Sequence, residues 1–196
     1  MSGGVIKSGS NGNTAEVDSE GRLTTFAVTR TEDVSSAKDG QAFLITHPLV
    51  ELTDDTESFV FYCKNDDTVS WILEDINASF GKSVSGDGAE FMSRTVIGAT
   101  GGSILSGDDG AAINLRVGNP TVLPATVKSG AQDATATGGA SLFPAIVVTD
   151  QMTARFIGGP IILPPSTSFA YAITPPAGNT SLKIKLSMLA FRELEE

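Results

Sequence analysis

The amino-acid sequence predicts an all-β protein: a jelly-roll-like antiparallel β-sandwich preceded by an extended N-terminal arm. Between residues 181 and 191, apolar side chains from Leu182 to Met188 alternate with polar ones, as in a strand with one buried face. Turns rich in proline and glycine separate the apolar segments roughly every ten to fifteen residues, which is typical of sandwiches. No segment of ten or more residues has a convincing helical pattern.

Residues 1–40 are mostly polar and predict the extended arm. Within it, residues 15–18 and 22–28 predict two short strands around the turn at 18–21. The arm has too few apolar residues to bury a core, so we expect it to lie on its own chain, on a neighbouring subunit or on a larger assembly. The alternative is a flexible tail.

Residues 41–196 predict the jelly-roll β-sandwich, with about eight to ten strands. The fully apolar segment 58–63 predicts a central strand, whereas Pro124 restricts the segment 122–127 to a sheet edge. Loops are predicted at 81–90, 99–110 and 128–140, and the last of them is expected to be exposed. Residues 191–196 are predicted to form at most one helical turn. The other strands are predicted at 42–46, 49–52, 69–80, 91–97, 113–117, 142–148 and 153–157, and the C-terminal third predicts three strands in succession, within 156–163, 168–173 and 181–191.

Charge and cysteine content narrow the class of protein. The 196 residues include 23 acidic and 13 basic side chains, a net charge of −10, which argues against a basic face for nucleic acid. A single cysteine precludes an intrachain disulfide. No apolar run is long enough to span a membrane, and the N-terminus has no signal-peptide pattern. We therefore expect synthesis in a cytoplasm.

The sequence predicts no catalytic, cofactor-binding or metal-binding residue. His47 is the only histidine, no Gly-x-Ser-x-Gly elbow is present, and Cys63 lies in an apolar run that predicts a buried structural thiol. The acidic clusters 54–57, 66–67 and 108–109 suit a cation by their oxygen ligands, but aspartate is common in turns and no EF-hand spacing is present. The glycine-rich segment 98–103 lacks the lysine of a phosphate-binding loop.

Two stretches carry a resemblance to a known class of proteins. One is Ala15-Glu16-Val17-Asp18-Ser19-Glu20-Gly21-Arg22-Leu23; the other comprises 161–168, with its Pro164-Pro165 turn, and 173–181, with its Pro175-Pro176 turn. Together they resemble small structural proteins in the virions of tailed bacteriophages. The resemblance implies a jelly-roll component of the particle, often trimeric, attached to the head or tail and lacking catalytic residues.

Three functions follow as expectations. The first is a non-enzymatic, homotrimeric capsid decoration or cement protein, assembled in the bacterial cytoplasm, that binds the major capsid protein or other virion proteins, and no membrane or nucleic acid. The second is a tail, collar or fibre component that binds a host surface through loops 81–90 or 128–140. The third is a jelly-roll carbohydrate-binding or carbohydrate-active protein, which would require exposed aromatic residues and paired acids.

Overall fold

The computed structural model describes residues 39–82, 90–149, 153–155, 160–178 and 181–193, together with residue 37 and three short strands nearer the N-terminus. The chain divides into two compact units, 1–32 and 33–196. In the first unit, β1 (Val5–Lys7), β2 (Thr14–Val17) and β3 (Leu23–Thr24) form an antiparallel sheet in that order. Strands on both sides of the turn predicted at 18–21 are therefore present, although residues 25–28 of the second predicted strand lie outside the described residues. β1 is a further strand that the sequence pattern did not predict.

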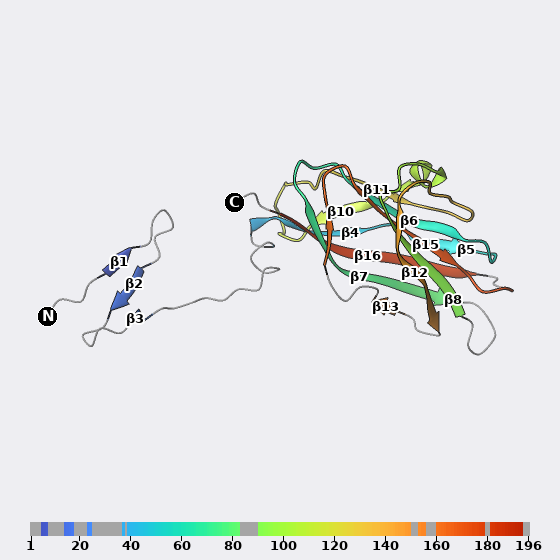
Figure 1. The fold of residues 1–196 in the computed structure, drawn as a ribbon, viewed down its shortest axis with the longest axis horizontal. Helices are drawn as coiled ribbons and strands as arrows, with labels where there is room; N and C mark the ends of the chain where they lie inside the picture. The colour runs from blue at the N-terminus through green and yellow to red at the C-terminus, as the bar shows by residue number, and fades with distance from the viewer. Residues whose placement is uncertain are drawn as a thin grey trace. The chain divides into compact units, whose positions relative to one another are not determined.

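The second unit consists of two antiparallel sheets, which confirms the all-β class and is consistent with a β-sandwich (Figure 1). The first sheet has the order β10 (Ala111–Asn114), β4 (Ala42–Thr46), β16 (Leu182–Arg192), β7 (Trp71–Lys82) and β13 (Thr153–Arg155), with β5 (Val50–Leu52) paired to β16 and β14 (Ile161–Leu163) paired to β7. The second has the order β12 (Ala140–Thr149), β8 (Glu90–Ile97), β15 (Ser168–Thr174), β6 (Ser58–Asn65), β11 (Ala125–Ser129) and β9 (Asp108–Asp109).

The last three strands, β14 to β16, do not pair with one another. β14 and β16 lie in the first sheet, and β15 lies between β6 and β8 in the second. The chain therefore crosses between the sheets at both proline-containing turns. Alternation in β16 is as predicted, because Leu182, Ile184 and Leu186 are buried while the lysines between them are exposed. The jelly-roll order of these strands stays a prediction.

The core fills the space between the two sheets. Its largest fully buried side chains include Trp71 and Leu73 from the first sheet and Phe61, Phe169 and Tyr171 from the second. Each apolar strand supplies one inward face to this cluster, so burial of these side chains is the main force that holds the sheets together.

The second sheet is also covered on its outer face, which explains why β6 and β15 are buried on both sides. The short 3-10 helix η1 (Ser103–Ser106) places Ile104 in a second apolar cluster, and Ala134 joins it from the loop after β11. The amide of Phe59 donates a hydrogen bond of 2.8 Å to the carbonyl of Ala134. The loop predicted at 128–140 is present from residue 130 on, because 128 and 129 belong to β11. Most of the residues from 131 to 140 are exposed, as predicted, but Ala134 is buried against the sheet.

Other boundaries differ from the sequence predictions. The strand predicted over 113–117 is β10, which ends at Asn114, and β11 begins only after Pro124, near the sheet edge as expected. Phe191 and Arg192 continue β16 instead of forming a helical turn, because they pair with β7. Residues 83–89, which hold most of the predicted loop 81–90, and residues 156–159 lie outside the described residues. Within the described ranges, no helix has the length and apolar character needed to cross a membrane.

Candidate functional site

His47 follows β4 and is buried in the second unit, with an exposed fraction of 2%. The amide of Leu186 donates to Nε2 at 2.8 Å, so the ring proton resides on Nδ1, which lies 3.2 Å from the Ser129 hydroxyl. Burial lowers the pKa of His47 to about 4; a backbone hydrogen bond at Pro48 opposes this shift, and the charge of Lys185 adds to it. A neutral imidazole therefore connects the strands that carry Ser129 and Leu186.

Cys63, in β6, is fully buried. Burial raises the pKa of its thiol to about 12, although a backbone hydrogen bond at Phe169 lowers it slightly. At neutral pH the side chain is thus a thiol within the core, which agrees with the structural role predicted for it.

The acidic turns are engaged by protein groups. The Asp66 carboxylate accepts from Lys64 Nζ and from the Thr126 hydroxyl, both at 2.6 Å. Asp109 lies 2.6 Å from Lys128 Nζ. Among the residues that the structure describes, no cluster of three or more His, Cys, Asp or Glu side chains could hold a metal ion.

The acidic turn at 54–57 supports the loop that covers the second sheet. Asp54 accepts from the amide of Thr56 at 2.9 Å and from the side-chain amide of Gln132. Glu57 pairs with Arg94, whose guanidinium lies 5.1 Å from the centroid of the Phe59 ring. These carboxylates have structural partners on the protein itself.

Asp67 is the most buried acid of these turns, and it meets Arg192 at the end of β16. Arg192 Nη2 donates to Oδ1 at 3.0 Å, and Nε lies 2.6 Å from Oδ2. Burial of Asp67 acts to raise its pKa, but hydrogen bonds from Arg192 and the Thr68 amide outweigh it and hold the pKa below its usual value. This ion pair fixes the turn after β6 to the C-terminal strand.

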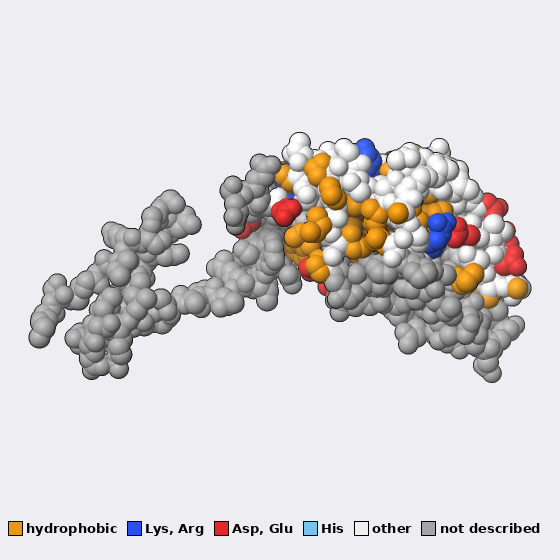
Figure 2. Space-filling model, viewed as in Figure 1, with side chains coloured by type: hydrophobic (Ala, Val, Ile, Leu, Met, Phe, Trp, Pro, Cys, Tyr) orange, Lys and Arg blue, Asp and Glu red, His pale blue; other side chains and the backbone are white. Residues whose placement is uncertain are grey.

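The described residues include an exposed apolar surface near the edge strand β10. Ile113, Leu115, Val117 and Val122 have exposed fractions of 51%, 40%, 98% and 73%. Apolar side chains gather over the region of β10 and β11 on the face in view (Figure 2). We call residues 115–122 the apolar loop. A patch of exposed aliphatic residues of this kind is typical of an interaction site.

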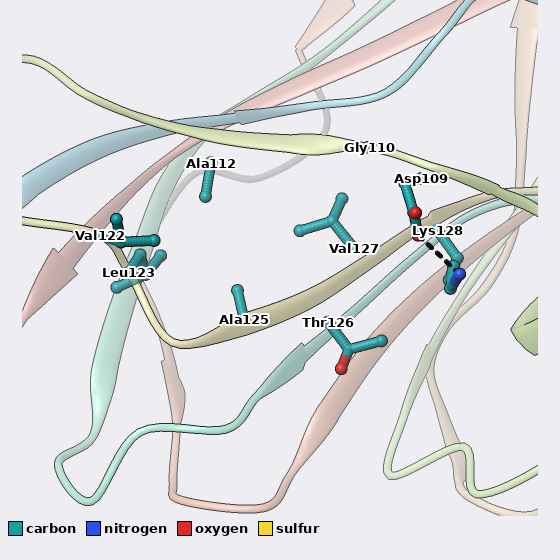
Figure 3. Close-up of a pocket in the computed structure, with 9 residues that line it drawn as sticks. All are labelled: Asp109, Gly110, Ala112, Val122, Leu123, Ala125, Thr126, Val127 and Lys128. Carbon is teal, nitrogen blue, oxygen red and sulfur yellow. Dashed lines mark hydrogen bonds and ion pairs between the residues drawn. The ribbon is translucent and has the colours of Figure 1, made fainter.

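Next to the apolar loop, a groove of about 490 Å³ opens between β10 and β11. We call it the edge groove; it is lined by Asp109, Gly110, Ala112, Val122, Leu123, Ala125, Thr126, Val127 and Lys128. Figure 3 shows Ala112 on one side, Val122 to Ala125 on the other, and the Asp109–Lys128 ion pair at one end.

The groove exists because the chain leaves one sheet for the other at Gly110. β9 pairs with β11, Gly110 still donates its amide to the Val127 carbonyl at 3.0 Å, and β10 then pairs with β4. A Cβ at Gly110 would lie 2.4 Å from Val127 Cγ1, so only glycine permits this close approach. Beyond this point the strands separate, and the small side chains Ala112 and Ala125 leave the space between them open.

Hydrogen bonds hold the apolar loop in one conformation. Asn114 accepts from the Arg116 amide at 2.9 Å and donates to the carbonyls of Gly40 and Thr121. The amide of Asn119 donates to the carbonyl of Arg116 at 3.0 Å, which closes a turn with Val117 at its tip. The most exposed apolar side chain of the described surface therefore stands on an ordered turn.

The sequence predicted a strand over 113–117 and assigned no role to this surface. In β10 it is Ala112 that faces inward and Ile113 that faces out. One signal was present in the composition: residues 111–127 contain no acid and a single basic residue, Arg116, in a strongly acidic chain.

The chain has no match among the protein-family models, and neither the curated proteins nor the solved structures include a similar one.

Proposed function

We propose that this chain is a non-enzymatic structural component of a tailed-phage particle, present in multiple copies, and most specifically a trimeric jelly-roll protein that decorates the outside of the capsid. The observation that carries the proposal is the ordered apolar loop beside the edge groove, where Val117 is 98% exposed. A contiguous exposed aliphatic patch of this kind is typical of a surface that a subunit buries on association.

The buried residues support the same function. The only histidine has both ring nitrogens in hydrogen bonds to the protein, and the only cysteine lies in the core. The side chains that most often act as general base or nucleophile thus serve the stability of the two sheets.

The jelly-roll part of the proposal is supported by the way the chain alternates between sheets. β4 lies in the first sheet and β6 in the second, β7 in the first and β8 in the second, and β14 to β16 alternate again. Such alternation is expected of two interlocked Greek keys. The virion assignment itself is supported by the resemblance of residues 15–23 and 161–181 to phage structural proteins.

A carbohydrate-binding function receives less support. The eight large apolar side chains that are exposed in the described residues are all aliphatic or methionine. Sugar platforms use exposed aromatic rings, so this surface suits a protein partner better than a glycan.

The test is to locate the chain in native particles. Mass spectrometry and electron microscopy of particles from the source culture should find it in high copy number on the head surface. A handful of copies on the tail would favour the host-binding alternative, and its absence from every particle fraction would refute the proposal. Deletion of residues 1–32, the first compact unit, tests the arm without removing Gly40, to which Asn114 donates: capsid binding should be lost and self-association retained.

A further inference from the structure

We infer that the apolar loop of one copy seats in the edge groove of a second copy, with Val117 as the central inserted side chain. The inference rests on the proposed multi-copy function and specifies the surface through which the copies meet. Loop and groove are adjacent parts of the segment 109–128, so each subunit presents both halves of the contact.

Charge favours a second copy as the occupant. Two chains that each carry a net charge of −10 repel one another over most of their surfaces. Residues 111–127 contain no acidic side chain, and at the end of the groove Asp109 and Lys128 neutralise each other at 2.6 Å. This surface is therefore one where two identical acidic proteins can approach with little repulsion.

The shape and order of the two halves agree with this contact. The loop is held by Asn114 and Asn119, so seating it costs little conformational entropy. One part of the groove is apolar, with two alanines that leave room for a branched side chain and with Val122, 73% exposed, at the rim. The rest of the lining is polar, but Thr126 already donates to Asp66 and Lys128 to Asp109. An aliphatic side chain can therefore enter the apolar part without leaving these two groups unpaired.

The size of the patch fits the centre of a subunit interface. The exposed fractions of Ile113, Leu115, Val117 and Val122 correspond to about 500 Å² of surface, against about 800 Å² per partner in a stable interface. The neighbouring polar residues of β10 and β11 would supply the rim. The inserted side chain, Val117, and the groove that receives it lie at different places on each copy. Two copies can therefore each insert Val117 into the other about a twofold axis, or several copies can form a ring in which each inserts into the next, as in the expected trimer.

Sedimentation velocity of the full-length chain over a range of concentrations tests the inference. V117D replaces a fully exposed side chain and leaves folding intact, which its thermal unfolding checks. We expect it to weaken self-association by at least about 30-fold, the effect of losing a central contact residue. The matched control is I162D, because Ile162 is 59% exposed on β14, away from β10 in the first sheet. It should associate like the wild type.

A charge-swap experiment tests which residues meet. V117D and V122K should each fail to self-associate, since each places a charge in an apolar contact. Mixed together, they should associate again at least as far as a pair, because residue 117 of the V117D copy then faces residue 122 of the V122K copy with opposite charge. A ring of three should stay open, because one of its junctions would join two copies of the same variant. Failure of the mixture to associate, with both variants folded, would overturn the proposed pairing.

The outcomes separate this inference from the proposed function. If the wild type associates and V117D associates equally well, the copies meet elsewhere: the inference is wrong and the particle function stands. If the wild type is monomeric at all concentrations, the inference is also wrong, and the count of copies in native particles decides the proposed function independently.

Discussion

Among the groups whose pKa the folded structure shifts, only His47 should change the free energy of unfolding between pH 7 and pH 4.5. In the folded protein the pKa of His47 is about 4, whereas in the unfolded chain it returns to 6.5. Between these values the unfolded chain binds a proton that the folded protein excludes. Folding stability is therefore complete above pH 6.5 and falls as the pH decreases toward 4.

The magnitude follows from the two pKa values. A shift from 6.5 to about 4 corresponds to about 3 kcal/mol in full, of which about 2.5 kcal/mol is lost by pH 4.5. This is a large part of the 5–15 kcal/mol that is typical of a folded domain. Asp66 and Asp67 do not contribute in this range, because their pKa values are below 3.8 in the folded protein and their stabilising effect is lost only at lower pH.

Urea unfolding at several pH values measures this loss of stability. The signal is the fluorescence of Trp71, which is the single tryptophan and is fully buried. The perturbation is H47Q, which retains an acceptor for the Leu186 amide but cannot be protonated. It should lose about 1–3 kcal/mol at pH 7 from imperfect hydrogen bonding, and its stability should be nearly flat from pH 7 to 4.5. The control S129A keeps the imidazole and should retain the slope. Equal slopes in wild type and H47Q would refute the reasoning.

Two further predictions concern stability. D67N leaves Arg192 without its carboxylate partner, and because Asp67 is buried we expect the free energy of unfolding to fall by about 2–3 kcal/mol at pH 7, measured by urea unfolding. Below pH 4, where Asp67 of the wild type becomes protonated, the difference in stability between D67N and the wild type should shrink. A difference that stays constant with pH would contradict this prediction. G130A should cost more than about 3 kcal/mol, because its Cβ would lie 1.7 Å from the carbonyl oxygen of Phe59. G118A, at a positive φ of 81° with no atom within 4 Å, should cost only about 1 kcal/mol. Urea unfolding measures both glycine variants, and similar losses in both would show that close packing at residue 130 is not the limiting factor.

The strands that the sequence predicted best are those whose surroundings are simple. β16 faces the core on one side and solvent on the other, so its apolar and polar residues alternate in step with the buried and exposed positions. β6 is apolar from Phe59 to Cys63 because both of its faces are covered there, and the sequence located it as a central strand. In both cases the exposed or buried state of a residue depends mainly on its own strand.

The exposed apolar surface beside the edge groove could not be predicted in this way. Ile113 and Leu115 have the same alternating pattern as a core strand, yet β10 ends at Asn114 and Ile113 faces outward. Whether such a residue is covered depends on β11, from which β10 separates when the chain crosses from the second sheet to the first at Gly110. Ala134 shows the opposite case: its loop was predicted to be exposed and largely is, but this one residue is buried against the second sheet.

Hydrophobic period, turn residues and charge act locally, so the all-β class, most strand positions, the acidic composition and the buried environment of Cys63 could be predicted from the residues alone. The order of the strands, the alternation of the last three between sheets, the neutral and doubly hydrogen-bonded His47 and the groove between β10 and β11 became evident only in the folded protein. These features arise where segments distant in sequence meet, because pairing, burial and open space are properties of two segments together and of neither alone.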